Sequence, residues 1–118
     1  MKRDFTYIDD IIEGVLRTMD RVPKNKINKF SASIAPYELY NIGNNNPVNL
    51  DDFIRAIEIA CGKKALRKNM PMQQGDVPIT YADVDPLIQD VGFKPSTSIK
   101  DGVKKFVDWY KKAELQNY

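Results

Sequence analysis

The chain has 118 residues, a size typical of one domain, and 42% of them are hydrophobic, which is enough for a modest core. Its 18 basic and 16 acidic side chains give a net charge of +2, and the basic residues are scattered, so no nucleic-acid partner is expected. No apolar run approaches the ~18 residues of a membrane span, so no membrane partner is expected either.

The first part of the sequence predicts a short strand and then a helix. Phe5 and Tyr7 alternate with polar residues across residues 3–8, which is the pattern of a half-buried strand. Asp9 and Asp10 suit the positive end of a helix, whose apolar face comprises Ile11, Ile12, Val15, Leu16 and Met19. We expect this helix to end before Pro23 and residues 23–36 to form an exposed polar connection.

The middle of the chain predicts a second strand and a second helix. Residues 38–42 form the strand, Gly43 bounds it, and the asparagines before Pro47 make a turn. Asn49 is placed to cap a helix that ends at Gly62, a residue typical of helix C-termini. The residues of this helix that are expected to face inward are Leu50, Phe53, Ile54, Ile57 and Cys61.

The last part predicts a third strand and two more helices. Residues 65–70 form the strand, and Asp83 caps a short helix that runs through Gln89 and ends by Gly92. Ser98 and Asp101 resemble a capping box before the last helix, which buries Ile99, Val103, Phe106, Val107 and Tyr110. Short strands alternating with helices predict an α/β fold for a single domain over residues 1–118.

Several kinds of catalytic site are excluded by composition. The chain has no histidine and one cysteine, Cys61, which removes the usual metal clusters and the triads that need histidine. We therefore expect no metal site, a packing role for Cys61 and a reduced, cytoplasmic setting. Three pairs of acidic residues stand at predicted helix starts, namely Asp9/Asp10, Asp51/Asp52 and Asp83/Asp85. Helix capping explains these pairs, and the alternative is that one of them is a catalytic carboxylate pair.

Residues 70–83 are irregular yet rich in groups that recognise polar ligands. Gln73 and Gln74 offer amide donors and acceptors, Asp76 is a carboxylate acceptor, and Gly75 allows close backbone approach. Segments of this kind are either functional or mobile.

Three blocks of sequence resemble nucleotide-sugar epimerases and dehydratases, the extended branch of the short-chain dehydrogenase/reductase superfamily. They are Arg3-Asp4-Phe5-Thr6-Tyr7-Ile8-Asp9-Asp10, Tyr40-Asn41-Ile42-Gly43, and Met72-Gln73-Gln74-Gly75-Asp76-Val77 followed by Thr80-Tyr81-Ala82-Asp83. Their wording is most similar to UDP-glucuronate 4-epimerases, and they cover the C-terminal part of such an enzyme. The resemblance implies the substrate-binding portion of an extended Rossmann-type enzyme, from which the N-terminal NAD-binding Rossmann domain is absent.

Two features of the superfamily's chemistry are missing from this chain. No tyrosine is followed four positions later by lysine, because Ile11, Asn41, Asn44, Asp85 and Glu114 stand there, and the glycines form no phosphate-binding cluster. We therefore expect no catalytic residue and no cofactor site here, so that NAD binds the missing half. A strand under way at residue 3 agrees with a piece of a longer protein, with Met1 as an added start.

The resemblance implies three substrate-binding residues. Arg3 matches an arginine that holds the substrate pyrophosphate; the alternative is a surface arginine at a frayed end. Asp76 matches the acid that accepts from ribose hydroxyls; the alternative is an Asx turn. Gln73 stands where related enzymes carry a phosphate-binding arginine, so it implies a weaker polar contact. Tyr7 and Tyr81 are expected to pack.

By this resemblance the full-length protein is an NAD-dependent isomerase that converts UDP-glucuronate through a 4-keto intermediate. It would supply precursors of capsular or cell-surface polysaccharides, bind a UDP-sugar and form a homodimer, while the fragment alone would be inactive. Two alternatives stay open: a nucleotide-sugar dehydratase or decarboxylase of the same superfamily, and a stand-alone binding module without catalysis.

Overall fold

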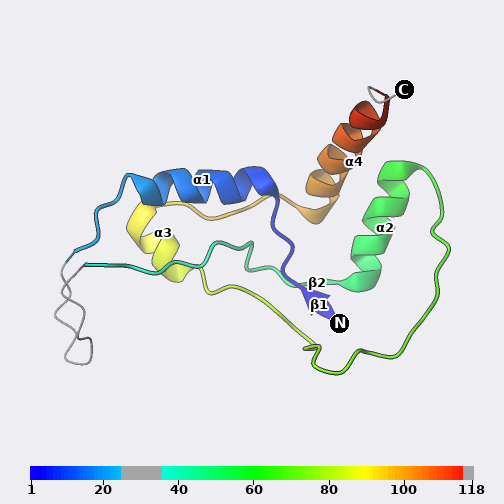
Figure 1. Cartoon of the computed structure of the whole chain (residues 1–118), viewed down its shortest axis with the longest axis horizontal. Coiled ribbons are helices and arrows are strands. Elements are labelled where there is room, and N and C mark those ends of the chain that lie inside the picture. The colour runs from blue at the N-terminus through cyan, green and yellow to red at the C-terminus, as the bar shows by residue number, and fades with distance from the viewer. Residues whose placement is uncertain (25–35, 116–118) are drawn as a thin grey trace.

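The computed structural model describes residues 1–24 and 36–115, which form four helices and a two-stranded sheet (Figure 1). The predicted α/β class is confirmed. The connection expected over residues 23–36 lies mostly outside the described residues. In chain order the elements are β1 (Lys2–Arg3), α1 (Ile8–Met19), β2 (Val48–Asn49), α2 (Leu50–Cys61), α3 (Asp85–Val91) and α4 (Ile99–Leu115).

The sheet is smaller than the sequence predicted. β1 pairs antiparallel with β2, and on its other side Lys2 donates its N–H to Pro78 and accepts from Thr80. The strands expected over residues 38–42 and 65–70 do not form, and the one over residues 3–8 shrinks to β1. A strand needs a neighbour for its backbone groups, and no other described segment pairs with these residues. Phe5 instead stacks on Phe53, with 4.1 Å between ring centroids.

Helix α1 forms where expected but buries a different face. Gly14 is the residue of α1 that is buried, and it packs directly against Ile42. A Cβ added at Gly14 would come within 3.0 Å of the isoleucine side chain, so the two segments approach closely there. The predicted apolar face is wrong as a core face, since Ile12, Val15, Leu16 and Met19 are all exposed. Only Ile11 of that set is half-buried.

Helices α2 and α4 lie beside each other, and their ends are set by local signals. Gly62 ends α2 with φ of 71°, a left-handed conformation that favours glycine. Asn49 occupies the N-cap of α2 without a capping bond from its side chain. Ahead of α4, Ser98 accepts the N–H of Asp101 at 3.1 Å and donates to its carboxylate. Val103 and Val107 are buried as predicted, but Phe106 and Tyr110 are exposed.

Helix α3 is short and lies beside α1. It spans Asp85–Val91, and its N-cap is Val84 rather than the expected Asp83, whose carboxylate accepts the N–H of Asp85. Gly92 caps its C-terminus with φ of 65°. The largest fully buried side chains of the described residues are Leu87 within α3, Val84 just before it and Pro95 shortly after it. None of the described helices is long and apolar enough to cross a membrane.

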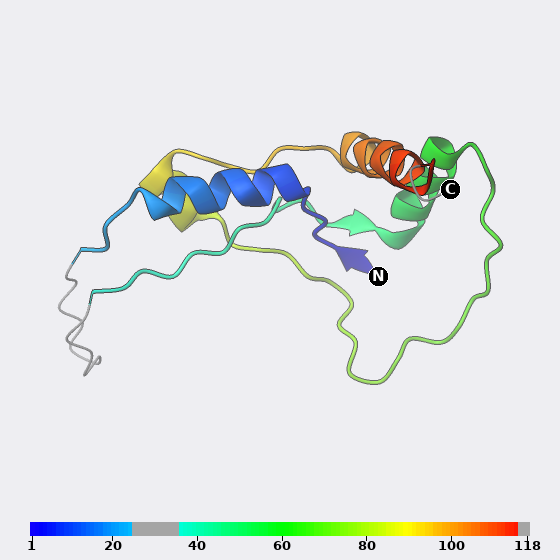
Figure 2. The same ribbon diagram turned by 45° about the horizontal axis from the view of Figure 1, so that its top comes forward.

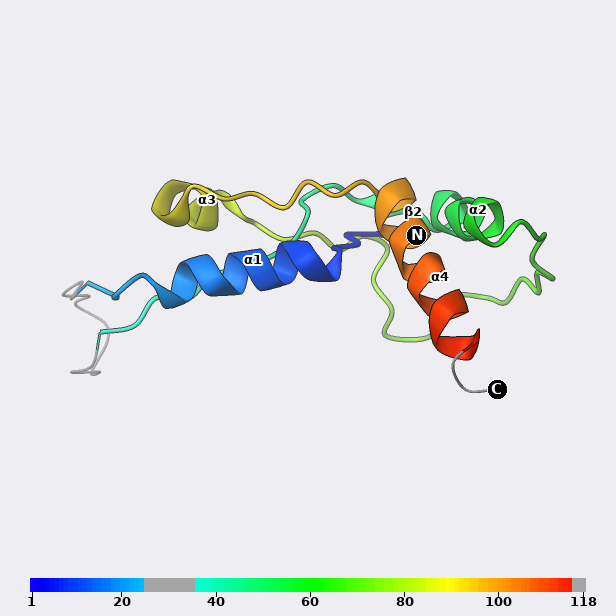
Figure 3. The ribbon, with the colours of Figure 1, turned by 90° about the horizontal axis from the view of Figure 1, so that it is seen from above.

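The whole molecule is elongated. Helices α1 and α3 lie at one end and α2 and α4 at the other, and the segment that follows α2 loops outward before residues 78–80 return to β1 (Figures 1, 2 and 3). The radius of gyration is 18.7 Å, against about 13 Å for a compact domain of this length. A chain this open leaves apolar helix faces uncovered.

Candidate functional site

The segment that carries the predicted site is tied to β1. Besides the backbone bonds of Lys2 to Pro78 and Thr80, a turn closes between Gln73 and Asp76, whose N–H donates to the Gln73 carbonyl at 3.2 Å. Gly75 in this turn has φ of 89°, a conformation that side chains other than glycine rarely adopt. The turn therefore presents Asp76 toward the start of the chain.

Arg3 and Asp76 are 73 positions apart and meet directly. One Arg3 amino group donates to the Asp76 carboxylate at 2.7 Å, and the other donates to the carbonyls of Val77 at 2.6 Å and Lys2 at 3.1 Å. Arg3 is thus not a loose arginine at a frayed end, and the partner of the Asp76 side chain is this guanidinium rather than a turn amide. Both side chains still reach solvent, with 22% and 38% exposed.

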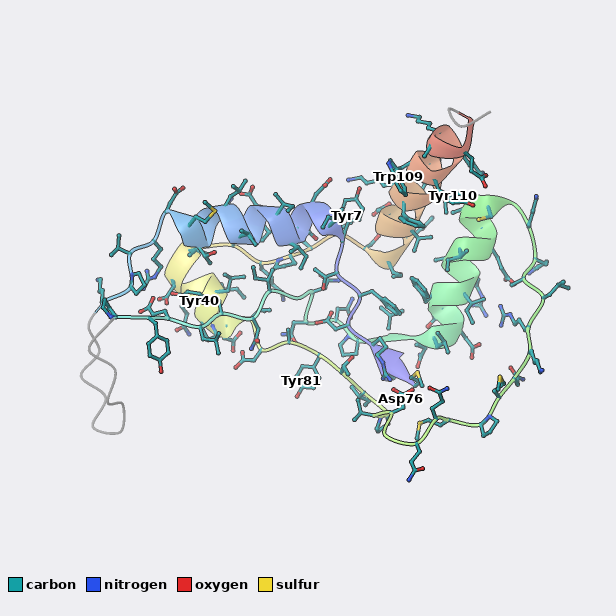
Figure 4. The ribbon with its side chains drawn as sticks, viewed as in Figure 1. Tyr7, Tyr40, Asp76, Tyr81, Trp109 and Tyr110 are labelled. Carbon is teal, nitrogen blue, oxygen red and sulfur yellow. The ribbon has the colours of Figure 1, made fainter. Side chains whose placement is uncertain are left out.

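The pair keeps capacity for a ligand. A guanidinium has five N–H groups, and the contacts of Arg3 with other described residues occupy three of them. Five minus three leaves two N–H groups for an anion, and a carboxylate accepts more bonds than the one from Arg3. Figure 4 shows Asp76 on the loop beside β1. Gln73 shares the exposed turn through its carbonyl, and its side-chain role stays a prediction.

Asp4 is a structural residue that sequence analysis missed. Its carboxylate accepts backbone N–H groups of Asn45 at 2.9 Å, Ala82 at 3.2 Å and Asn46 at 3.4 Å. Gly43 completes this junction, because an added Cβ would come within 2.6 Å of Ala82. Asp4 therefore holds three distant segments together behind the site. The position of this acid directly after Arg3 was the one sequence feature that pointed to Asp4. Its hydrogen-bond partners are distant in sequence and are identified only from the fold.

Asp10 also has a role beyond helix capping. It accepts the N–H groups of Thr97 at 2.9 Å and Ser96 at 3.2 Å, and so ties the start of α1 to the segment before α4. This contact accounts for the carboxylate without catalysis.

Tyr40 is held in a hydrogen-bonded cluster that does not suit a catalytic base. Tyr40 lies between Glu38 and Asp90 near α3, with both carboxylates 2.6 Å from its hydroxyl and Arg21 bonded to each of them (Figure 4). Burial, and then the bonds to these carboxylates, raise the pKa of Tyr40 far above its usual value. A hydroxyl that holds its proton this firmly donates hydrogen bonds and does not abstract protons.

A polar hollow of about 330 Å³ lies at the Asp4 junction, and the residues that line it include Asp4, Thr6, Asn41, Thr80 and Tyr81. Tyr81 is exposed here, contrary to its expected packing role, whereas Tyr7 packs against Gly102 as expected. The described residues contain no group of acids and cysteine that could hold a metal ion.

Comparisons with known proteins place this geometry in context. No family model matches the chain. It is 51% identical over 93% of its length to Protein CapI of Staphylococcus aureus, and 42% identical over its full length to the Probable UDP-glucuronate 4-epimerase of Rhizobium meliloti. The chain spans about a third of these relatives, 35% and 36% respectively.

Solved structures agree with the relatives. UDP-glucuronic acid 4-epimerase from Bacillus cereus, in complex with UDP-glucuronic acid and NAD, matches with a TM-score of 0.72 and 26% identity over 93% of this chain and 32% of its own. UDP-glucose 4-epimerase from Bifidobacterium longum, with NAD⁺ and UDP, shares the fold with a TM-score of 0.75 and 23% identity, over 92% of this chain and 30% of its own. These findings confirm the resemblance that the sequence blocks indicated.

Proposed function

Because the relatives and structural neighbours of this chain are nucleotide-sugar epimerases, matched over their C-terminal part, we propose that it is the substrate-binding part of a UDP-glucuronate 4-epimerase. In this proposal the NAD-binding Rossmann domain is the N-terminal part of the same polypeptide. The complete enzyme inverts the C4 hydroxyl of UDP-glucuronate and supplies precursors of cell-surface polysaccharides.

The observation that carries the proposal is the Arg3–Asp76 pair. The guanidinium of Arg3 and the carboxylate of Asp76 are 73 positions apart in the chain and 2.7 Å apart in the structure. The exposed turn that contains Gln73 lies beside them. A guanidinium binds diphosphate oxygens through charge-assisted, forked hydrogen bonds, and a carboxylate accepts from the vicinal hydroxyls of a ribose. Arg3 therefore holds the diphosphate of UDP, and Asp76 holds its ribose.

Gln73 supplies a neutral polar contact to the same nucleotide. The backbone N–H of Asp76 donates to the carbonyl of Gln73, so the two residues lie in one turn. A ligand bound to Asp76 is therefore close to Gln73. The amide carries no charge, so its bond to a phosphate is weaker than that of an arginine.

The start of α1 does not offer the site that NAD needs. A dinucleotide pyrophosphate needs a glycine-rich turn leading into a helix, whereas α1 begins at Ile8 directly after Tyr7. The cofactor therefore belongs to the N-terminal part, and the task of this chain is to bind and orient the UDP-sugar, a proximity effect. The proposal includes a cytoplasmic homodimer with no nucleic-acid or membrane partner.

The test is an assay of the complete polypeptide with UDP-glucuronate and NAD, followed by anion-exchange chromatography. UDP-galacturonate is the expected product. Release of CO₂ would identify a decarboxylase, and a dehydrated 4-keto product from another UDP-sugar would identify a dehydratase. Binding of UDP-sugars without any turnover by the complete polypeptide would favour the non-catalytic module.

A further inference from the structure

A second polar hollow, which we call the asparagine hollow, shares no lining residue with the Arg3–Asp76 pair or with the hollow at the Asp4 junction. It is lined by residues 44–46 and 94–96. Its volume of about 480 Å³ lies within the range of about 300–1,000 Å³ that small-ligand sites occupy. Figure 3 shows the segment between α3 and α4 passing beside the segment that leads into β2, and these two segments form its walls.

Each wall of the asparagine hollow is held in place by a carboxylate that does not line it. Asp4 accepts the N–H groups of Asn45 at 2.9 Å and Asn46 at 3.4 Å. Asp10 accepts the N–H of Ser96 in the opposite wall at 3.2 Å. The hollow is therefore formed by the fold itself, and a ligand that enters it orders few residues.

Asn44 is the buried polar residue of the asparagine hollow, with 9% of its surface exposed. Its amide nitrogen donates to the carbonyl of Thr97 at 3.5 Å, and its backbone N–H donates to the hydroxyl of Thr6 at 3.2 Å. The described residues supply no donor to its amide oxygen, which is open to the hollow rather than sealed in. Buried polar groups usually have partners, so this oxygen is placed to accept from a ligand.

The other polar groups of the asparagine hollow are two amides, a hydroxyl and an ammonium. The side chains of Asn45, Asn46 and Ser96 have no hydrogen-bond partner in the described parts of the chain. The ammonium of Lys94 has no ion-pair partner there either, and of the described residues that line the hollow it carries the one charge. Amides both donate and accept, as sugar hydroxyls do, and an ammonium binds a carboxylate through charge-assisted bonds.

The same lining argues against other ligands. The described residues that line the hollow include no aromatic side chain on which a nucleobase could stack, and no second cation for a diphosphate. One positive charge beside three amides fits a ligand with one negative charge and several hydroxyl groups. Sugar acids have this composition.

We propose that the asparagine hollow binds a hexuronate, with the carboxylate on Lys94 and the hydroxyls on the amides of residues 44–46. This site is separate from the one proposed for the UDP-sugar, and the inference does not rest on the proposed function. The hexuronate comes either as a free sugar acid or as the uronate unit at the end of a saccharide chain, and both sources share this chemistry.

The test is a saturation-transfer NMR titration of the complete polypeptide with D-glucuronate, in the presence of excess UDP to occupy the nucleotide site. Saturable binding at millimolar concentrations is expected. D-glucose has the hydroxyls without the carboxylate, and acetate has the carboxylate without the hydroxyls, so each should bind about tenfold or more weakly. Methyl β-D-glucuronide distinguishes the two sources, because its blocked anomeric position resembles a chain end. Its binding identifies a saccharide-chain site, and its exclusion identifies a site for the free sugar acid.

Two substitutions assign the binding to this hollow. Lys94→Gln removes the charge, and Asn45→Gly removes an amide at a position whose φ of 50° glycine adopts without strain. Each should weaken D-glucuronate binding about fivefold or more, while the melting temperature changes little. The matched control is Lys100→Gln, which removes an exposed lysine of α4 that does not line the hollow. It should bind D-glucuronate as the wild type does.

Four outcomes would overturn the proposal. They are no saturable binding of D-glucuronate, equal binding of D-glucuronate and D-glucose, equal binding of D-glucuronate and acetate, which would mean an adventitious ion only, and equal effects of Lys94→Gln and Lys100→Gln. The readout is independent of turnover. A complete polypeptide that binds D-glucuronate through Lys94 but does not convert UDP-glucuronate would reject the proposed function and retain this site.

Discussion

Substitutions at Asp76 distinguish a ligand-binding role of this residue from a structural one. Its carboxylate pairs with Arg3 at the surface, where an ion pair contributes about 0–1 kcal/mol to stability. In the complete polypeptide we expect Asp76→Ala to weaken UDP-sugar binding about tenfold or more, because charge-assisted bonds of roughly 1.5–3 kcal/mol are lost. Isothermal calorimetry measures the loss, and the melting temperature should change little.

The matched control is Asp76→Asn, which keeps the shape and removes the charge. It should also weaken binding, since asparagine offers one neutral oxygen to the guanidinium and the ribose, whereas the carboxylate offers two charged ones. Full affinity for Asp76→Asn, together with a lower melting temperature for Asp76→Ala, would make the residue structural.

Arg3→Ala should lose affinity mainly at low salt, because its partner is a phosphate.

Glu58 should make the stability of this chain depend on acidity. It is only 9% exposed and accepts the N–H of Ala65 at 3.0 Å. That bond first, and Arg67 and Lys64 after it, lower the pKa of Glu58 below its ordinary value. A lowered folded-state pKa stabilises the fold above the unfolded-state value of about 4.3, and the stabilisation disappears as the pH falls through the folded-state value.

The measurement is the melting temperature of this chain and of Glu58→Gln between pH 7 and pH 3. The wild type should exceed the variant by a constant margin from pH 7 to about pH 5, and the margin should shrink below about pH 4. A margin that does not change with pH would show that the charge of Glu58 contributes nothing to folding.

At the scale of elements, the first turn of α1 offers a comparison between neighbouring acids. Asp9 and Asp10 both lie in that turn and both suit the helix dipole, but only Asp10 accepts the N–H groups of Ser96 and Thr97. Asp10→Ala leaves these amides without their partner and should cost about 1–3 kcal/mol. Asp9→Ala removes only a dipole contribution of about 0.3–1 kcal/mol.

Urea unfolding of the two variants measures the difference. Equal losses would mean that the contact between α1 and the segment before α4 does not stabilise the fold in solution. A larger loss for Asp10→Ala would assign the second acid of the Asp-Asp motif to joining elements rather than to catalysis.

At the scale of the whole molecule, the open shape predicts weak function for the isolated chain. It lacks the tyrosine–lysine pair and the glycine-rich turn, so incubation with NAD and UDP-glucuronate should yield no UDP-galacturonate. Calorimetry should detect UDP binding no tighter than about millimolar, because fixing each residue of the 70–83 segment costs about 1–2 kcal/mol. Turnover above a protein-free control, or micromolar binding, would support the stand-alone module instead.

Local signals in the sequence determined the helices and their ends. Gly62 and Gly92 end α2 and α3 because glycine adopts the left-handed conformation without strain, and Ser98 opens α4 through bonds to Asp101. The sequence blocks also indicated the family and singled out Arg3 and Asp76. The helix ends depend on residues a few positions apart, and the family resemblance depends on short contiguous motifs, so both can be identified from the sequence.

Only the tertiary structure decided which apolar residues are buried and which polar groups meet. Periodicity marked Leu16 and Phe106 as inward residues, yet both are exposed, because a helix face is buried only where a second element covers it. The predicted strand over residues 38–42 fails for the same reason, since strand pairing depends on a partner distant in sequence. The direct contact of Arg3 with Asp76, and the junction at Asp4, likewise join residues that only the path of the folded chain brings together.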